Sequence, residues 1–203
     1  MDITIIGAGN IGGTLARKWA AKDHRVTLGV RDPHKREVER LLGELGASAR
    51  ATLVLEAVSG ADVVLFAVPG GSMHETVASM GDALNGKVVI DATNNIGGST
   101  FNSVDALSSA APRADIYRAF NTYGWENFES PVFDGTAADL LYAGPDGDSR
   151  DVAEQLISEV GLRPVWLGGL DKASLVDSLL PLWFTLSSER GLGRHFAFKI
   201  LRT

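Results

Sequence analysis

Short apolar runs, several of them β-branched, alternate along the chain with longer segments whose apolar residues recur at a helical spacing. This alternation predicts strands joined by crossover helices, as in a parallel sheet. Runs such as DVVLFAVP and KVVIDAT are apolar at nearly every position, which is typical of strands covered by helices on both faces. The predicted strands span residues 3–6, 26–29, 63–67, 88–91, 116–120, 140–143 and 165–167. We therefore expect a doubly wound α/β fold with a mainly parallel sheet and helices on both faces.

The regular alternation stops after Phe120, where the stretch NTYGWENFESPVFDGTA is rich in aromatic residues, glycine, proline and asparagine. We place a boundary there between a first domain, residues 1–120, and a small C-terminal α/β extension, residues 121–203, although the two can also count as one domain. The end of the extension is more apolar than one helix face against a small sheet requires. We expect its apolar side chains to complete the core or to form an interface, and we favour a homodimer. These side chains are Leu182, Trp183, Phe184 and Leu186.

The composition narrows the class of protein and of partner. The chain has 203 residues, of which 45% are hydrophobic and 22% charged, as expected of a globular protein. It contains no cysteine, which excludes disulfides, thiolate metal sites and cysteine nucleophiles. The formal net charge is -6, and lysines and arginines are scattered among carboxylates, so we expect no nucleic-acid partner. Because no signal-like or membrane-spanning segment is evident, we expect a cytoplasmic protein that binds a small molecule and no membrane.

A glycine-rich turn follows the first predicted strand. Three of its glycines form the pattern G-A-G-N-I-G between that strand and a helix predicted over residues 11–21. In this order, the first glycine allows a tight turn, the second lets a pyrophosphate approach the backbone, and the third allows close helix packing. The pyrophosphate then lies at the positive end of the helix. A turn used only for packing is the alternative, but we expect a Rossmann-type dinucleotide site. The expected contacts are Gly7, Ala8, Gly9, Asn10, Ile11 and Gly12.

The end of the second predicted strand indicates which dinucleotide is bound. Arg31 follows that strand, and Lys35 lies about one helical turn further on. A guanidinium can hold a 2'-phosphate through two hydrogen bonds while the ammonium adds a second charge, so this arrangement favours NADP. Asp32 would suit NAD instead, but next to Pro33 it is equally suited to be a helix N-cap. A solvated surface is the other interpretation of the two cations, because charged loop residues are usually exposed.

Taken in order, the motifs IIGAGNIGGTLARKWA, GVRDP, FAVP, IDATNN, RAFNT and GLGRHFAFKILR resemble bacterial members of the NADP oxidoreductase, coenzyme F420-dependent, family. The resemblance covers nearly the whole chain. It implies hydride transfer between NADPH and a flavin-like acceptor, either a deazaflavin or an ordinary flavin. Such a transfer mainly requires that two rings lie face to face, so we expect no catalytic triad, no acid–base residue and no metal. We expect the four histidines at the surface or in core packing.

By analogy with this family, further cofactor contacts lie at the carboxyl ends of the strands, where open α/β sheets bind their ligands. These expected contacts are Val30, Ala67, Val68, Pro69, Asn94, Asn121 and Trp125. The amides of Asn94 and Asn121 would orient the nicotinamide carboxamide or the acceptor ring, although asparagine at a strand end is nearly as often a turn residue. Trp125 would stack on a ring, although the aromatic residues of such a loop often form a small core of their own.

The sequence departs from the archaeal members of the family mainly on the acceptor side. Asn121 stands where those members have histidine, Leu180 where they have a hydroxyl residue, and Val30 replaces a hydroxyl residue beside Arg31. The sequence therefore supports NADP more strongly than any particular acceptor. Two other functions stay open. One is a small-substrate NADP-dependent dehydrogenase or imine reductase, which normally continues into a long helical domain. The other is a regulatory module that binds NADP without turnover.

Overall fold

The computed structural model describes residues 1–202, and its centre is a six-stranded parallel sheet in the order β3-β2-β1-β4-β5-β6. The chain adds β2 and β3 on one side of β1 and then crosses over to add β4, β5 and β6 on the other side. This strand order is that of the dinucleotide-binding fold. The strands are β1 Asp2–Ile6, β2 Arg25–Val30, β3 Ala49–Leu53, β4 Val63–Phe66, β5 Val88–Asp91 and β6 Asp115–Arg118. The Rossmann-like, doubly wound α/β fold that the sequence predicts is confirmed.

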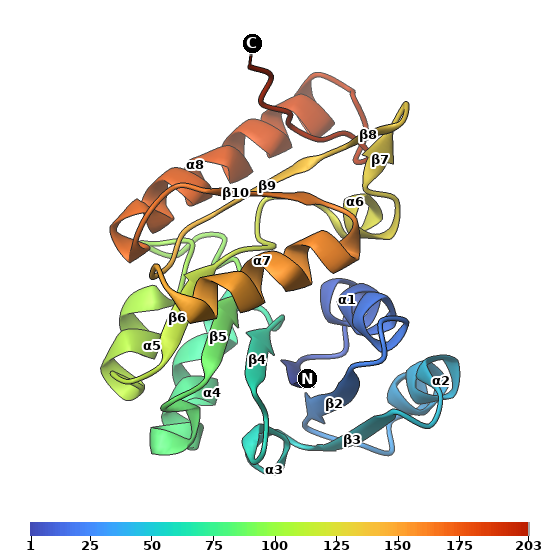
Figure 1. Cartoon of the computed structure of the whole chain (residues 1–203), viewed down its shortest axis with the longest axis vertical. Coiled ribbons are helices and arrows are strands. Elements are labelled where there is room, and N and C mark those ends of the chain that lie inside the picture. Colours follow the sequence, from blue (N-terminus) through green and yellow to red (C-terminus); the bar gives the residue numbers. More distant parts are fainter. Residues whose placement is uncertain (203) are drawn as a thin grey trace.

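Helices cover both faces of this sheet, because successive residues of each strand point to opposite sides. Ile5 and Leu65 belong to the core cluster on one side, and their neighbours Ile6 and Phe66 belong to the cluster on the other. The first cluster is covered by α1 Asn10–Ala20, α2 Arg36–Leu45 and α7 Asp148–Val160. The second is covered by α3 Val54–Val58, α4 Met73–Met80 and α5 Val104–Ala110 (Figure 1). Helix α7 comes from the C-terminal extension, so the extension shares a core with the first half.

Several elements escaped the sequence-based prediction because they carry no apolar run. The edge strand β3 has the sequence ARATL and no fully buried residue, since it pairs on one side with β2 alone. The stretch after Phe120, predicted to be irregular, contains a short helix and a two-stranded antiparallel hairpin. These are α6 Trp125–Glu129, β7 Val132–Phe133 and β8 Thr136–Ala137. Short 3-10 segments occur at Gly70–Ser72, Gly81–Leu84 and Leu170–Lys172.

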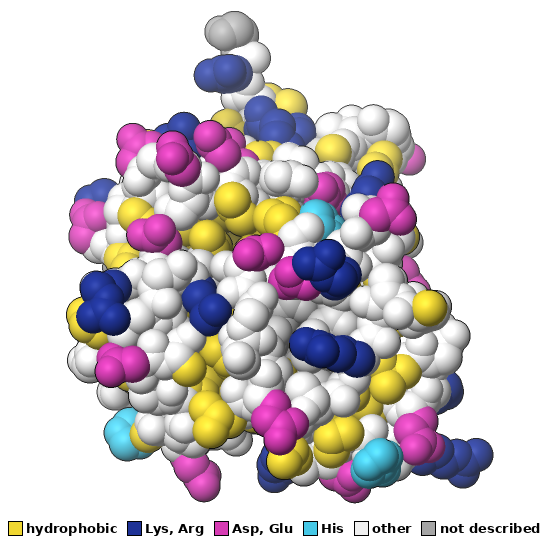
Figure 2. Space-filling view, turned by 60° about the horizontal axis from the view of Figure 1, so that its bottom comes forward, with side chains coloured by type: hydrophobic (Ala, Val, Ile, Leu, Met, Phe, Trp, Pro, Cys, Tyr) yellow, Lys and Arg dark blue, Asp and Glu magenta, His cyan; other side chains and the backbone are white. Residues whose placement is uncertain are grey.

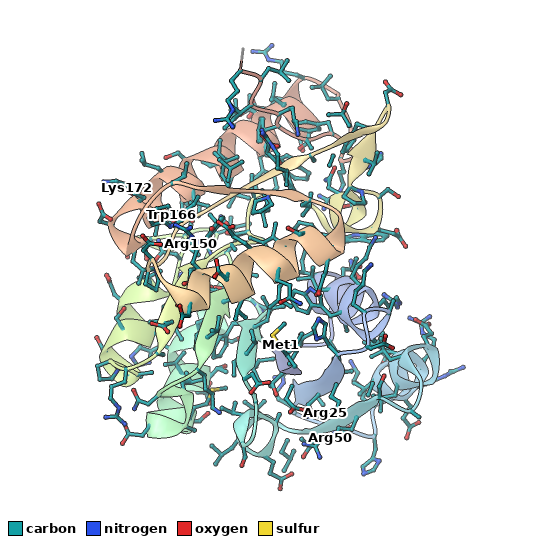
Figure 3. The ribbon with its side chains drawn as sticks, viewed as in Figure 1. Met1, Arg25, Arg50, Arg150, Trp166 and Lys172 are labelled. Carbon is teal, nitrogen blue, oxygen red and sulfur yellow. The ribbon has the colours of Figure 1, made fainter. Side chains whose placement is uncertain are left out.

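The last two predicted strands form a separate parallel pair, β9 Asp139–Tyr142 and β10 Arg163–Trp166, with α7 as their crossover. An antiparallel bridge between Arg118 and Ala143 joins this pair to the main sheet. The indole Nε1 of Trp19 in α1 donates to the backbone oxygen of Leu156 in α7 at 3.0 Å. At the other end of α7, the Arg150 guanidinium lies 4.7 Å from the centre of the Trp166 ring (Figure 3). The bridge and the Trp19 bond therefore fix the extension to the first half of the chain.

The chain ends with α8 Ala173–Phe184, a π-helical turn at Thr185–Glu189 and an extended tail that returns across the extension (Figure 1). Asp139, whose side chain has no exposed surface, fastens this tail: its Oδ2 accepts from the backbone N–H of Ile200 at 2.7 Å and from Arg163 at 2.6 Å. Burial alone would raise the pKa of Asp139, but these bonds and Lys199 lower it below its ordinary value. The carboxylate is thus ionised while it holds the tail.

The surface carries both signs of charge. Figure 2 shows one face on which lysine and arginine side chains are interspersed with aspartate and glutamate. Within residues 1–202, no helix combines the length and the apolar character needed to cross a membrane.

Candidate cofactor and acceptor site

The three glycines of the first turn occupy three different environments. Gly7 adopts φ +105°, and a Cβ placed there would lie 2.6 Å from the backbone oxygen of Ala67. A Cβ on Gly12 would lie 2.0 Å from the backbone oxygen of Gly7, so α1 can pack this closely only with glycine there. Both glycines are therefore required by the fold itself.

Gly9 differs, because nothing in the protein lies within 4 Å of a Cβ built on it. Its φ of -75° is open to any residue. The free space lies at the N-terminus of α1, where no side chain caps the helix and the first turn holds no acidic residue. The first N–H groups and the positive end of the helix dipole are thus left for an anion. This arrangement fits a dinucleotide pyrophosphate, with Ala8, Asn10 and Ile11 beside it.

The loop after β2 presents cations to solvent. Arg31 is exposed and has no ion pair within residues 1–202, and the exposed Lys35 lies 3.6 Å from Glu37. The Asp32 carboxylate accepts from the backbone N–H of His34, and α2 begins only at Arg36, so the N-cap interpretation of Asp32 was wrong. The side chain of Val30 is buried in the core, which leaves its backbone at the loop.

The loop after β4 packs tightly on its neighbours at the carboxyl end of the sheet. Ala67 and Val68 lie against Gly7, because a Cβ built on Gly7 would meet atoms of both residues within 3.0 Å. Pro69 follows at the surface. A Cβ on the next residue, Gly70, would lie 2.4 Å from the backbone nitrogen of Asn95. The ends of β1, β4 and β5 therefore meet at one place, which is where this fold binds nucleotides.

A pocket of about 260 Å³ opens where this edge of the sheet meets the extension. Five residues expected from the sequence line it: Asn10, Ile11, Asn94, Asn121 and Trp125. The remaining lining residues are Thr122, Tyr123, Gly124, Leu180, Trp183, Phe184 and Arg194. The wall opposite the glycine turn is thus built by α8 and the tail, which lie far away in sequence.

Arg118, the last residue of β6, is fully buried and lies at the centre of a polar network behind this pocket. Its Nε donates to Oδ1 of Asp177 in α8 at 2.8 Å, and its Nη2 lies 2.7 Å from the same oxygen. Its Nη1 donates to the backbone oxygens of Asp91 and Thr93 at 3.1 and 2.5 Å. Nη2 also donates to Oδ1 of Asn94 at 2.9 Å. All three nitrogens of the guanidinium therefore have hydrogen-bond acceptors, and β5, β6 and α8 are held together.

The two carboxylates beside Arg118 are also fully engaged. Oδ2 of Asp91 lies 3.4 Å from Arg118 Nη1 and accepts from the backbone N–H of Ser103 at 2.7 Å. Oδ2 of Asp177 accepts from the amide of Asn102 at 2.6 Å. Buried charges with such partners are ion pairs that serve the structure rather than free acids or bases. Buried ion pairs thus support the pocket from behind, and neither of these two carboxylates is free to act on a substrate.

Three buried polar atoms on lining residues have no partner in the structure. They are Oδ1 of Asn121, Oγ1 of Thr122 and Nε1 of Trp183. Tyr123 is different: its hydroxyl donates to the backbone oxygen of Asp139 at 2.6 Å, and burial raises its pKa to about 12. Buried polar groups are normally hydrogen-bonded, so these three atoms are left for partners that the chain itself does not supply.

The aromatic residues of the loop after Phe120 divide into two groups. Tyr123, Phe128 and Phe120 form a small core. The ring centre of Phe128 lies 6.4 Å from that of Tyr123 and 5.6 Å from that of Phe120. Trp125 is half-buried, lines the pocket and has no aromatic partner within residues 1–202. The small-core interpretation therefore applies to Tyr123 and Phe128, whereas stacking by Trp125 stays a prediction. On the far wall, the Arg194 guanidinium lies 5.1 Å from the centre of the Trp183 ring and pairs with Glu126 at 2.6 Å.

The sequence-based prediction missed Arg118, Asp177, Thr122 and Arg194. For the first two a signal exists, because IYRAFN and SLVDSLL each place one charged residue inside an apolar run. Such a charge is buried only if it has a partner elsewhere in the chain. Thr122 and Arg194 carry no comparable signal, since hydroxyl residues and arginines in loops are common.

Comparison with known proteins places the chain in a family. Residues 2–95 match the family model described as NADP oxidoreductase coenzyme F420-dependent. An F420-dependent NADP reductase from Methanothermobacter thermautotrophicus is 31% identical over 208 residues, which cover 92% of this chain and 89% of the relative. A solved structure from Arthrobacter sp. FB24, provisionally described as an F420-dependent NADP reductase, matches with a TM-score of 0.86 at 25% identity and covers both chains completely.

An imine reductase from Aspergillus terreus matches with a TM-score of 0.69 at 23% identity and covers 94% of this chain but 62% of that one. This likeness concerns the fold. The long match to the reductase from Methanothermobacter, together with the family model, identifies the chain as a member of the NADP oxidoreductase, coenzyme F420-dependent, family and as an NADP-dependent oxidoreductase.

Proposed function

We propose that the chain transfers a hydride between NADP(H) and a flavin-like acceptor, with a deazaflavin as the first candidate. The observation that carries this proposal is the chemistry of the pocket wall. It offers amides, a hydroxyl, indoles and one arginine, while its tyrosine and the nearby carboxylates are engaged by the protein. None of the four histidines lines it. Curated relatives named F420-dependent NADP reductases support the deazaflavin.

When bound, NADPH supplies the hydride. The part of this chain in the reaction is to bind two ring systems in one orientation and to exclude water between them. In our proposal the N-terminus of α1 binds the pyrophosphate, Arg31 and Lys35 bind the 2'-phosphate, and the loop after β4 supports the ribose. Asn94 and Asn121 orient the ring at the entrance of the pocket. Residues 121–203 complete the acceptor side, and Trp125 stacks on a ring there.

An imine or carbonyl reductase is the alternative enzyme. Reduction of such a substrate adds a proton as well as a hydride, so it requires a proton donor within hydrogen-bond reach. The pocket-lining residues contain no histidine, lysine, aspartate or glutamate, and Tyr123 is already a donor to Asp139. A regulatory module that binds NADP without turnover is compatible with the same wall, and turnover separates it from the enzyme.

The direct test is a turnover assay with purified protein. NADPH is mixed with a deazaflavin, FMN, FAD or a panel of imines and ketones, and its absorbance is followed. We expect oxidation with at least one flavin-like acceptor and none with the panel, because the latter requires a proton donor. Oxidation by the imine or ketone panel alone, or tight NADPH binding without any oxidation, would contradict the proposal.

Gly9→Ala tests whether a pyrophosphate binds at the N-terminus of α1. The protein leaves open space for a methyl group there, so folding should be unchanged. A bound pyrophosphate would meet that methyl group, and the affinity for NADPH should fall by about tenfold or more, measured by calorimetry. Gly13→Ala is the matched control: its Cβ would lie 3.5 Å from Leu41, an ordinary contact, and alanine favours the helix by up to about 1 kcal/mol. Equal NADPH affinity in both variants would refute the assignment.

Arg31→Ala tests the preference for NADP. Loss of a charge-assisted bond to phosphate, worth about 1.5–3 kcal/mol, should raise the Michaelis constant for NADPH about 10- to 100-fold and leave that for NADH nearly unchanged. Arg40→Ala removes another exposed positive charge, from α2, and so controls for the change in net charge. If Arg31→Ala affected both coenzymes equally, the 2'-phosphate assignment would fail.

We also propose that the chain is a homodimer through α8. Leu175, Leu179 and Leu182 recur at helical spacing along one side of α8, and Leu175 and Leu182 are 56% and 46% exposed. Phe184 at the end of the helix is 38% exposed, while Trp183 is buried in the core. An exposed apolar stripe of this kind is typical of an interface.

Light scattering tests the dimer. We expect a mass of twice 21.5 kDa for the wild type and a folded monomer for Leu182→Glu, because the side chain is exposed within a single chain and is not part of its core. A monomeric wild type at all concentrations would reject this interface.

A further inference from the structure

The buried network fixes the orientation of one amide in the pocket. Asn121 is 2% exposed, and its Nδ2 donates to Oδ1 of Asp177 at 3.3 Å. An ionised carboxylate can only accept hydrogen bonds, so the amino group of Asn121 must face Asp177. The carbonyl oxygen of the same amide then faces away from Asp177, and it is one of the three buried atoms without a partner.

Asp177 itself has no freedom to turn. The same Oδ1 accepts a hydrogen bond from Arg118 Nε at 2.8 Å and lies 2.7 Å from Arg118 Nη2, and Oδ2 accepts from Asn102 at 2.6 Å. Arg118 is held in turn by backbone oxygens at the end of β5. On the other side, the backbone oxygen of Asn121 accepts from the amide of Asn94 at 2.7 Å. The side-chain amide of Asn121 is thus held through its Nδ2, and the backbone that carries it is held through its carbonyl oxygen.

We propose that Arg118 and Asp177 are positioning residues that make Asn121 present a hydrogen-bond acceptor to the ligand, so that the site selects a ring bearing an amide or imide N–H at this point. The proposal rests on the proposed function, because the pocket must bind a nicotinamide or a flavin-like ring. Either ring supplies the required chemistry: the nicotinamide carboxamide has an N–H₂ group, and the pyrimidine part of a flavin or deazaflavin has an imide N–H.

Two pairs of probes distinguish these sources. NADPH is compared with its reduced 3-acetylpyridine analogue, whose acetyl group lacks the N–H. FMN is compared with FMN methylated at its imide nitrogen. Dissociation constants are measured by calorimetry on the full chain. For the wild type we expect the N–H probe of one pair to bind about tenfold or more tightly than its partner, because a buried acceptor left unpaired is costly. Equal binding within both pairs would overturn the proposal.

Variants then test each part of the arrangement. Asn121→Leu removes the hydrogen-bond acceptor, and the ratio of the two dissociation constants within the discriminating pair should fall to about one. Asp177→Ala should do the same, because the amide can then turn, whereas Asp177→Asn should keep the ratio, since its oxygen can still face Arg118 and Asn121. Thr4→Val removes a buried hydrogen bond of 2.6 Å in β1 and controls for general loss of stability, with the ratio retained.

Thermal unfolding checks that each variant is folded, and Asp177→Ser, which is shorter but polar, replaces Asp177→Ala if that variant does not fold. A ratio that persists in Asn121→Leu, or one that Asp177→Asn abolishes, would contradict the positioning role. These binding ratios are separate from the proposed function. If NADPH binds but no acceptor is reduced, the proposed function fails, while the nicotinamide pair still tests the role of Asn121.

Discussion

The site depends on one buried charge. A guanidinium without exposed surface is tolerated only when its charge and all its N–H groups are matched, and removal of one partner of such a pair generally costs several kcal/mol. Arg118 meets this condition by drawing Asp91, two strand-end carbonyls and Asn94 together with Asp177 from α8. The helix that closes the pocket is therefore placed by an electrostatic requirement of the sheet. Apolar packing alone would allow α8 to slide, whereas hydrogen-bond geometry does not.

The dinucleotide half could be predicted because its constraints are local. Gly7 must adopt a positive φ, Gly12 must lie against the backbone of Gly7, and both conditions act within a few residues of sequence. Strands buried on two faces likewise produce continuous apolar runs that are visible without a structure. The edge strand β3 escaped because neither of its faces is fully buried, and the short elements after Phe120 escaped because their stability comes from contacts with the distant tail.

The acceptor side could be predicted only in part, because its partners are distant in sequence. Asn94 and Asn121 were predicted from their place at strand ends and from a family resemblance, and Trp125 from its aromatic-rich loop; the structure brings all three to one pocket. Asp177 lies 59 residues after Arg118, and the sequence around either residue does not identify the other as its partner. A charged residue inside an apolar run indicates that a partner exists, but only the fold shows which one. The pocket wall therefore combines local motifs with one long-range pairing.

The core beneath α7 has a consequence for the independence of the two halves. Trp19 of the glycine-motif helix is completely buried, and its indole bond ends on α7 of the extension, within one continuous hydrophobic cluster. A chain cut after Phe120 would expose this indole and the apolar face of the sheet around it. The segment that shapes the pocket is thus also part of what allows the nucleotide-binding half to fold. The pocket wall can therefore change by single substitutions, whereas the extension cannot be exchanged as a free module.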